Sequence, residues 1–207
     1  MSRYRVYYRR HLPHYQPPGA TLFVTFRLHG SLPQDVLEAL HAQENMIQNS
    51  DLDEQAAQKA RSELFWRLDD ALDSGGSRPL WLKNAEVAGM VADAIRFLDG
   101  KKYELLAYCI MPNHVHLVIT PLPVDESKEQ YHPLSDIMKS LKGFTARRAN
   151  AILGHGGTFW QEEYYDHVVR DEKALERILQ YVMYNPVKAG LVENPEDWPW
   201  SYCKVYS

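Results

Sequence analysis

Hydrophobic positions in this chain follow two periods, one of two residues and one of about 3.6. Residues 20–28 combine β-branched and aromatic side chains between Gly19 and Gly30, which is typical of a strand. Residues 57–72 instead repeat apolar side chains every three or four positions, as on one helix face. Along the chain these patterns predict a strand over 20–28, helices over 34–48 and 52–73, a helix from Asn84 to Gly100, strands over 103–111 and 114–120, a helix over 134–153, a strand-like segment within 158–170 and a last helix from Asp171 to Pro186.

Two of these elements carry further expectations. The strands over 103–111 and 114–120 are joined by the short link Pro112-Asn113, so we expect an antiparallel hairpin. The helix over 134–153 is expected to turn one apolar face toward the core. That face comprises Ile137, Leu141, Phe144 and Ile152.

Length and composition favour one domain over residues 1–207. A chain of 207 residues with 45% hydrophobic composition can bury a full core. No apolar run approaches 18 residues, so we expect no membrane span, and the N-terminus lacks the apolar stretch of a signal peptide. Two cysteines without Cys-x-x-Cys spacing favour reduced thiols and a cytoplasmic location. The expected parts are an arm over 1–19, an inserted helical segment over 34–75 and an aromatic tail over 193–207 that closes over the core.

The net charge of −4 argues at first against nucleic acid as a partner, but its distribution reverses that argument. Residues 34–75 carry ten acidic and three basic side chains, so the rest of the chain has a balance of +3. We expect the acidic segment on the side of the molecule away from any phosphate backbone. Basic residues in the arm and in the helix over 134–153 are either solvated or contacts to phosphate. They are Arg3, Arg5, Arg9 and Arg10 in the arm, and Lys139, Lys142, Arg147 and Arg148 in the helix.

The candidate chemistry begins with His114-Val115-His116 at the start of a predicted strand. Side chains alternate between the faces of a strand, so both imidazoles point the same way and can ligate one metal ion. The alternative is a polar strand end with two unrelated histidines. Farther along, Tyr181 and Asn185 are four residues apart and share a helix face. Standing alone, this pair would favour a structural interpretation, with a buried tyrosine and a helix-capping asparagine.

Taken together, the four residues predict a metal site with a nucleophile beside it. Two imidazoles and an amide oxygen can hold Mg²⁺ or Mn²⁺, while water or phosphate completes the coordination shell. Tyrosine can act as a covalent nucleophile when a metal or a base assists its deprotonation.

Several motifs in order resemble the IS200/IS605-like single-tyrosine transposases, and in particular their REP-associated branch. The resemblance runs from about Tyr15 to Tyr202. It rests on Met111-Pro112-Asn113-His114-Val115-His116, Trp160-Gln161, Tyr165-Asp166-His167, Arg170, Tyr181-x-x-x-Asn185-Pro186-Val187-Lys188-Ala189-Gly190-Leu191-Val192 and Trp198-Pro199-Trp200-Ser201.

The resemblance implies an α+β fold of the ferredoxin or RRM type, an antiparallel sheet with helices on one face. It implies that His114 and His116 are metal ligands, that Tyr181 is the nucleophile and that Asn185 occupies the place of a third, amide-type ligand, where many relatives carry glutamine. The expected reaction is attack on a DNA phosphodiester to give a 5′-phosphotyrosine and a free 3′-hydroxyl. The expected substrate is single-stranded DNA folded into hairpins, such as repetitive extragenic palindromes (REP), with Lys188 as a further DNA contact.

Three functions remain open on the sequence alone. The first is the metal-dependent DNA transesterase, located in the bacterial cytoplasm and associated with the nucleoid when bound to DNA. The second is a hairpin-binding or regulatory protein that does not cut, and the third is a phosphodiesterase that uses water as the nucleophile. The sequence is equally compatible with a monomer and a homodimer.

Overall fold

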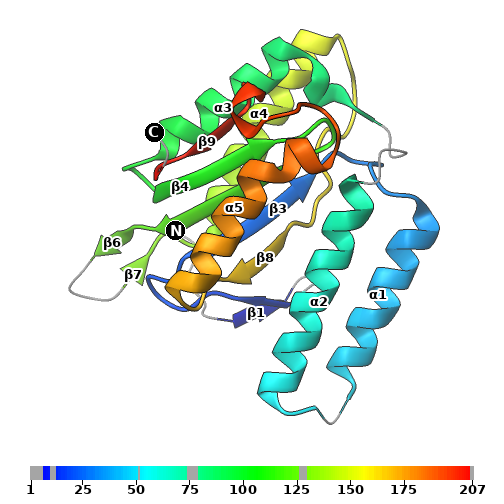
Figure 1. Cartoon of the computed structure of the whole chain (residues 1–207), viewed down its shortest axis with the longest axis vertical. Coiled ribbons are helices and arrows are strands. Elements are labelled where there is room, and N and C mark those ends of the chain that lie inside the picture. Colours follow the sequence, from blue (N-terminus) through cyan, green and yellow to red (C-terminus); the bar gives the residue numbers. More distant parts are fainter. Residues whose placement is uncertain (1–6, 10–12, 51, 74–78, 126–129, 206–207) are drawn as a thin grey trace.

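The computed structural model describes residues 7–9, 13–50, 52–73, 79–125 and 130–205. Its centre is a five-stranded antiparallel sheet in the order β8-β3-β5-β4-β9 (Figure 1). Two small antiparallel pairs, β1–β2 and β6–β7, lie outside this sheet. The strands are β1 (Tyr7–Arg9), β2 (Pro13–Tyr15), β3 (Leu22–Arg27), β4 (Tyr103–Ile110), β5 (His114–Pro121), β6 (Pro123–Asp125), β7 (Gln130–Tyr131), β8 (Tyr165–Val168) and β9 (Ser201–Cys203).

The predicted helices are present with boundaries close to those expected. They are α1 (Gln34–Gln48), α2 (Glu54–Asp73), α3 (Ala85–Leu98), α4 (Leu134–Leu153) and α5 (Glu172–Lys188), with short 3₁₀ turns at Trp81–Lys83 and Pro195–Asp197. The expected end of α5 at Pro186 was wrong by two residues. A proline this close to the end removes one backbone hydrogen bond without stopping the last turn, and Ala189 N still donates to Asn185 O. In the part of the chain that the structure describes, no helix is both long and apolar enough to cross a membrane.

Helices cover both faces of the sheet, so the expectation of helices on one face was wrong. α3 and α4 pack on one face, where Val91 and Ile137 belong to the same core cluster as Leu117. α5 lies across the other face, where Ile178 and Val182 pack with neighbours that include Val118. Figure 1 shows α5 in front of the sheet and α3 and α4 behind it. The predicted α+β class with an antiparallel sheet is confirmed.

Strand β5 divides its side chains between these two faces as its period predicts. Val115, Leu117 and Ile119 belong to the core under α3 and α4. His114 and His116 point to the face that α5 covers, together with Val118 of the second core. The neighbouring strand β3 pairs Thr25 with His116 and Arg27 with His114. Both histidines therefore lie under α5, in the middle of the sheet.

The α1–α2 hairpin stands beside β8, next to the face that carries α5 (Figure 1). Phe65 of α2 packs edge-on against Phe23 with ring centroids 5.0 Å apart, and Trp66 packs against Tyr181 at 4.9 Å. The acidic segment was expected on the side of the molecule away from any phosphate backbone, and that stays a prediction. The apolar residues of α2 bring it against the same face as the histidines.

Two smaller expectations concern the ends of the sheet and the α4 helix. The C-terminal tail does more than cover the core, because Ser201–Cys203 forms the edge strand β9 and Trp198 Nε1 donates to Ile110 O at 3.1 Å. Phe144 was expected to face inward, and that was wrong. It is 47% exposed and lines a groove of about 800 Å³ between α3 and α4, with Phe97 opposite.

Candidate active site

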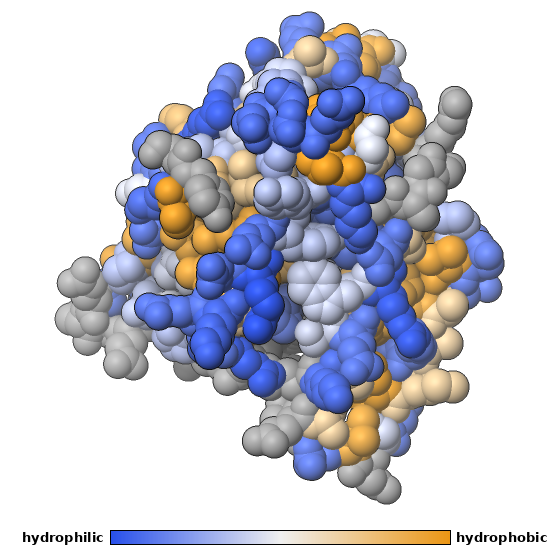
Figure 2. Space-filling model, in the orientation of Figure 1, coloured by the Kyte–Doolittle hydropathy of each residue, from blue (hydrophilic) through white to orange (hydrophobic). Residues whose placement is uncertain are grey.

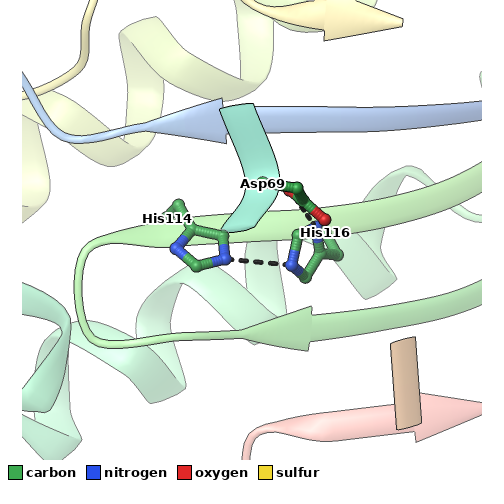
Figure 3. A group of neighbouring side chains, drawn as sticks. All are labelled: Asp69, His114 and His116. Atoms are coloured by element: carbon green, nitrogen blue, oxygen red, sulfur yellow. Dashed lines mark hydrogen bonds and ion pairs between the residues drawn. The ribbon is translucent and has the colours of Figure 1, made fainter. Parts of the chain in front are cut away.

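The two histidines of the His-x-His motif converge on one point. Both are fully buried, and their Nε2 atoms are 2.9 Å apart. Figure 3 shows the rings meeting at these nitrogens, while Asp69 approaches the other nitrogen of His116 from α2. The sequence prediction that both imidazoles serve one site is thus supported by their geometry.

The outer nitrogens of both rings are fixed by hydrogen bonds. His114 Nδ1 is 2.7 Å from Asn113 Oδ1, an atom that can only accept, so Nδ1 carries the proton. Asn113 is oriented in turn by its own amide, which donates to Leu72 O at 3.2 Å. His116 Nδ1 is 3.0 Å from Thr25 Oγ1, whose hydroxyl donates to Asp69 Oδ1 at 3.4 Å, so this Nδ1 donates as well. Both Nε2 atoms are left unprotonated and face each other, which is the arrangement of two ligands to one cation.

Burial keeps both imidazoles in the neutral form that binds metal. Loss of solvent, together with the nearby charge of Lys188, lowers the pKa of His116 to about 3. The pKa of His114 falls well below its ordinary value, first through burial and then through the neighbouring His116. Neutral imidazole is the ligating species, so the pair needs no deprotonation near neutral pH.

Tyr181 and Asn185 come to the same place from α5. Tyr181 Oη donates to Asp69 Oδ2 at 2.5 Å and accepts from Asn185 Nδ2 at 3.0 Å. The Tyr181 ring lies 5.7 Å from that of His116, and Asn185 is fully buried. Burial raises the pKa of Asp69 to about 7, although the hydrogen bond from Tyr181 opposes that rise. The four residues singled out in the sequence are therefore brought together, with Asp69 added to them.

Comparison with known proteins assigns this arrangement to a family. The family model described as Transposase IS200 like matches residues 82–185, which is half of the chain and includes both histidines, Tyr181 and Asn185. The chain belongs to the IS200-like transposase family. The resemblance seen in the sequence is confirmed.

Individual relatives indicate the same family. A candidate REP-associated tyrosine transposase of Haemophilus influenzae is 33% identical over 107 residues, covering 48% of this chain and 58% of that protein. The REP-associated tyrosine transposase of Escherichia coli is 27% identical over 108 residues, covering 52% and 58%. The chain thus spans somewhat more than half the length of the curated relatives it matches. A solved REP-associated tyrosine transposase bound to a REP hairpin shares the fold, with a TM-score of 0.54 at 19% identity over 97% of this chain and 82% of that chain.

The Nε2 atoms of His114 and His116 are spaced to fit a divalent ion. Two nitrogens bound to one ion at about 2.1 Å and at right angles lie about 3.0 Å apart, close to the observed 2.9 Å between the two Nε2 atoms. Among the described residues, Asp69, His114 and His116 form the one group of three acidic, histidine or cysteine side chains whose potential ligand atoms all lie within 4.8 Å of one another. The two histidines, with Asp69 beside them, are compatible with a divalent cation.

Sequence reasoning missed three members of the site: Asp69, Thr25 and Asn113. Asn113 was read as part of a turn, although it directly precedes the motif and could have been suspected for that reason. Asp69 is one of ten acidic residues in the inserted segment, and Thr25 lies within an apolar strand, so neither stands out in the sequence. Their roles depend on strand register and helix packing, which link residues far apart along the chain.

The basic residues proposed as DNA contacts are distributed over different parts of the chain. Lys188 lies beside the site, with Nζ 5.5 Å from the centre of the Tyr181 ring and 2.5 Å from Asp70 Oδ1. The α4 residues are on the helix layer behind the sheet, and Lys142 Nζ donates to the carbonyls of Gln161 and Glu162 at 2.6 Å each. The other three are Lys139, Arg147 and Arg148. Arg3, Arg5, Arg10 and the side chain of Arg9 lie outside the described residues.

Proposed function

We propose that this chain is a metal-dependent transesterase that cleaves and rejoins single-stranded, hairpin-containing DNA through a 5′-phosphotyrosine. The observation that carries the proposal is the position of Tyr181. Its hydroxyl, on a helix 65 residues beyond His116, hydrogen-bonds the same carboxylate that lies 3.7 Å from His116 Nδ1. A nucleophile beside a pair of metal-ligating histidines is the minimum that such a reaction requires.

His114 and His116 would hold Mg²⁺ or Mn²⁺ through their Nε2 atoms, and Asn185 would supply the third ligand through its amide oxygen. The amide nitrogen of Asn185 is turned toward Tyr181, which supports giving the oxygen to the ion. When bound, the ion polarises the scissile phosphate and stabilises the charge that develops on it. Asn185 would thus couple the nucleophile to the metal site.

The reaction conserves phosphodiester energy. Tyr181 Oη attacks the phosphorus and gives up its proton to a neighbouring acceptor, a new P–O bond forms, and the bond from phosphorus to the 3′-oxygen breaks. The released oxygen gains a proton and becomes a 3′-hydroxyl, while the 5′-phosphate stays on Tyr181. A strand's 3′-hydroxyl then attacks the same phosphorus, which reforms a phosphodiester and restores the tyrosine. One P–O bond is exchanged for another in each step, so no external energy source is needed.

DNA hairpins are the proposed partner. A solved family structure of the same fold is bound to a REP hairpin, and Lys188 places a cation next to the nucleophile of this chain. Figure 2 shows hydrophilic side chains over much of α5 and α2 on this face, with a paler band between the two helices. Because Tyr181 meets His116 of the same chain, a single copy has the parts of one site, which supports activity as a monomer. Action on chromosomal DNA is consistent with the expected cytoplasmic location.

Incubation with a 5′-extended hairpin oligonucleotide and Mn²⁺ tests the proposal. Wild type should give a covalent protein–DNA adduct on a denaturing gel, and Tyr181→Phe should give none. Tyr184→Phe is the matched control, because Tyr184 is on the same helix but 59% exposed, and it should react like wild type. Adduct that persists in Tyr181→Phe would refute the nucleophile. Binding without cleavage would favour a regulatory protein, and multiple turnover without adduct would favour water as the nucleophile.

A further inference from the structure

The last turn of α2 reaches from the inserted segment into the site, where it contacts Tyr181 and His116 directly and His114 through Asn113. We infer that Asp69 and the carbonyl of Leu72 make α2 the positioning element of the active site, with Asp69 as the residue that links Tyr181 to His116. This inference rests on the proposed function. It assigns to the acidic insertion a role that neither the His-x-His motif nor the tyrosine helix reveals.

Asp69 uses a different carboxylate oxygen for each partner. Oδ2 accepts from Tyr181 Oη at 2.5 Å, within the range of a strong hydrogen bond from a hydroxyl to a carboxylate. Oδ1 is 3.7 Å from His116 Nδ1, and the Thr25 hydroxyl joins the two by hydrogen bonds of 3.4 Å and 3.0 Å. The side chains of Asp69 and His116 are both fully buried. One buried carboxylate thus fixes the distance between the nucleophile and a metal ligand.

Asp69 acts on the metal site through His116, because it lies beside Nδ1 and not beside the Nε2 atom that would bind the metal. The carboxylate is at Nδ1 of the ring, whereas the convergence with His114 is at Nε2, the other nitrogen (Figure 3). Carboxylates that hold the outer nitrogen of a ligating histidine fix its tautomer and orientation. The Asp69 carboxylate therefore belongs behind the ligand, where it aims Nε2 at the ion.

Leu72 completes the arrangement through the other histidine. Its backbone carbonyl accepts from Asn113 Nδ2 at 3.2 Å, which turns Asn113 Oδ1 toward His114 Nδ1 at 2.7 Å. Asp69 and Leu72 are three residues apart and lie on one side of the helix. One turn of α2 consequently orients both imidazoles and the tyrosine.

Neighbouring contacts hold this turn in place. Phe65 packs on Phe23 of the sheet, and Trp66 packs on the Tyr181 ring. Asp70 pairs with Lys188 of α5 at 2.5 Å, but this pair is exposed and contributes little by itself. Asp70 thus offers a control next to Asp69 that removes a carboxylate from the same turn without entering the site.

The experiment compares Asp69→Asn with Asp70→Asn in the full-length protein. Single-turnover adduct formation is measured with saturating hairpin over a range of Mn²⁺ concentrations, alongside hairpin affinity. Loss of a residue behind a metal ligand typically costs about 10- to 100-fold in metal affinity or activity. Asp69→Asn should lower the adduct rate and raise the Mn²⁺ midpoint within that range while hairpin affinity stays within about twofold of wild type. Asp70→Asn should keep both the rate and the Mn²⁺ midpoint of wild type.

Two results would overturn the inference. Asp69→Asn with the rate and Mn²⁺ midpoint of wild type would show that the carboxylate positions nothing. Equal losses in Asp69→Asn and Asp70→Asn would show that general docking of α2 on α5 is what matters. If wild type gives no Tyr181 adduct, the proposed function is refuted, but the inference about α2 is not. Direct Mn²⁺ binding by electron paramagnetic resonance still decides the inference then, since Asp69→Asn must weaken it and Asp70→Asn must not.

Discussion

Asp69→Asn should stabilise the metal-free protein at neutral pH even though it impairs the site. In the fold, burial raises the pKa of this carboxyl from its ordinary value of 3.8 to about 7. Between these two values the folded protein keeps a proton that the unfolded chain has released, so the stability of wild type falls as the pH rises. The stability that protonated Asp69 contributes to the fold is fully present below pH 3.8 and is lost as the pH rises through about 7.

The size of the effect follows from the two pKa values. Each pH unit between them corresponds to about 1.4 kcal/mol, so the roughly three units amount to about 4 kcal/mol. Asparagine has nearly the same shape and does not titrate, so its variant lacks this pH dependence. A weaker hydrogen bond from Tyr181 shifts the whole curve of the variant by about 1–2 kcal/mol but does not change its slope.

Urea unfolding in EDTA at several values between pH 4 and pH 7.5 measures this difference. The free energy of unfolding of Asp69→Asn minus that of wild type should grow by about 4 kcal/mol across the range. Asp70→Asn is the control, because it removes an exposed carboxylate from the same turn and leaves the buried Asp69 in place, so its curve should keep most of the pH dependence of wild type. Parallel curves for Asp69→Asn and wild type would refute the argument that burial dominates the pKa of Asp69.

Two further predictions concern a ligand and a helix cap. Burial lowers the pKa of His116 to about 3, so below pH 6.5 the unfolded chain takes up a proton that the folded protein does not bind. In urea unfolding of the metal-free protein, the free energy of unfolding of His116→Gln should therefore rise relative to wild type by up to about 1.4 kcal/mol for each pH unit below 6.5. A constant difference between the two proteins would contradict this. Asn84 caps α3 by accepting from the backbone N–H groups of Glu86 and Val87 at 3.0 and 3.1 Å, so Asn84→Ala should cost about 1 kcal/mol in the same assay, and an unchanged midpoint would show that the cap is dispensable.

Local patterns in the sequence predicted those parts of the molecule that depend on neighbours along the chain. The period of two in residues 114–120 placed both histidines on one face, because alternation in a strand needs no tertiary information. The four-residue spacing of Tyr181 and Asn185 predicted their shared helix face for the same reason. The boundaries of α1 and α2 followed from turn residues and helical spacing.

The parts that could not be predicted depend on how distant elements pack. The acidic count of residues 34–75 did not indicate which face of the sheet α2 covers, because a few apolar contacts outweigh exposed charges in docking this helix. Asp69 comes one position after Leu68 in the apolar series Leu64, Leu68 and Leu72, so in the sequence it resembles a solvent-exposed residue beside the apolar face of the helix. Only register and packing place it at Tyr181. Phe144 shows the opposite error, because a helical period gives spacing but does not fix how wide the buried face is.

The hydrogen bond between Asp69 and Tyr181 spans 112 positions of the chain, and this bears on when activity appears during folding. Contacts between such distant segments form only after the chain has closed a long loop, and they are slow to form. The sheet and the histidine pair can be in place while the tyrosine lies outside the site. During synthesis the α5 segment emerges late, after both helices of the insertion and the central strands. Under the proposed function, a ribosome-bound or partly folded chain has the histidine pair without Tyr181 and Asn185 of α5 in position, so it is not expected to cut the DNA it meets.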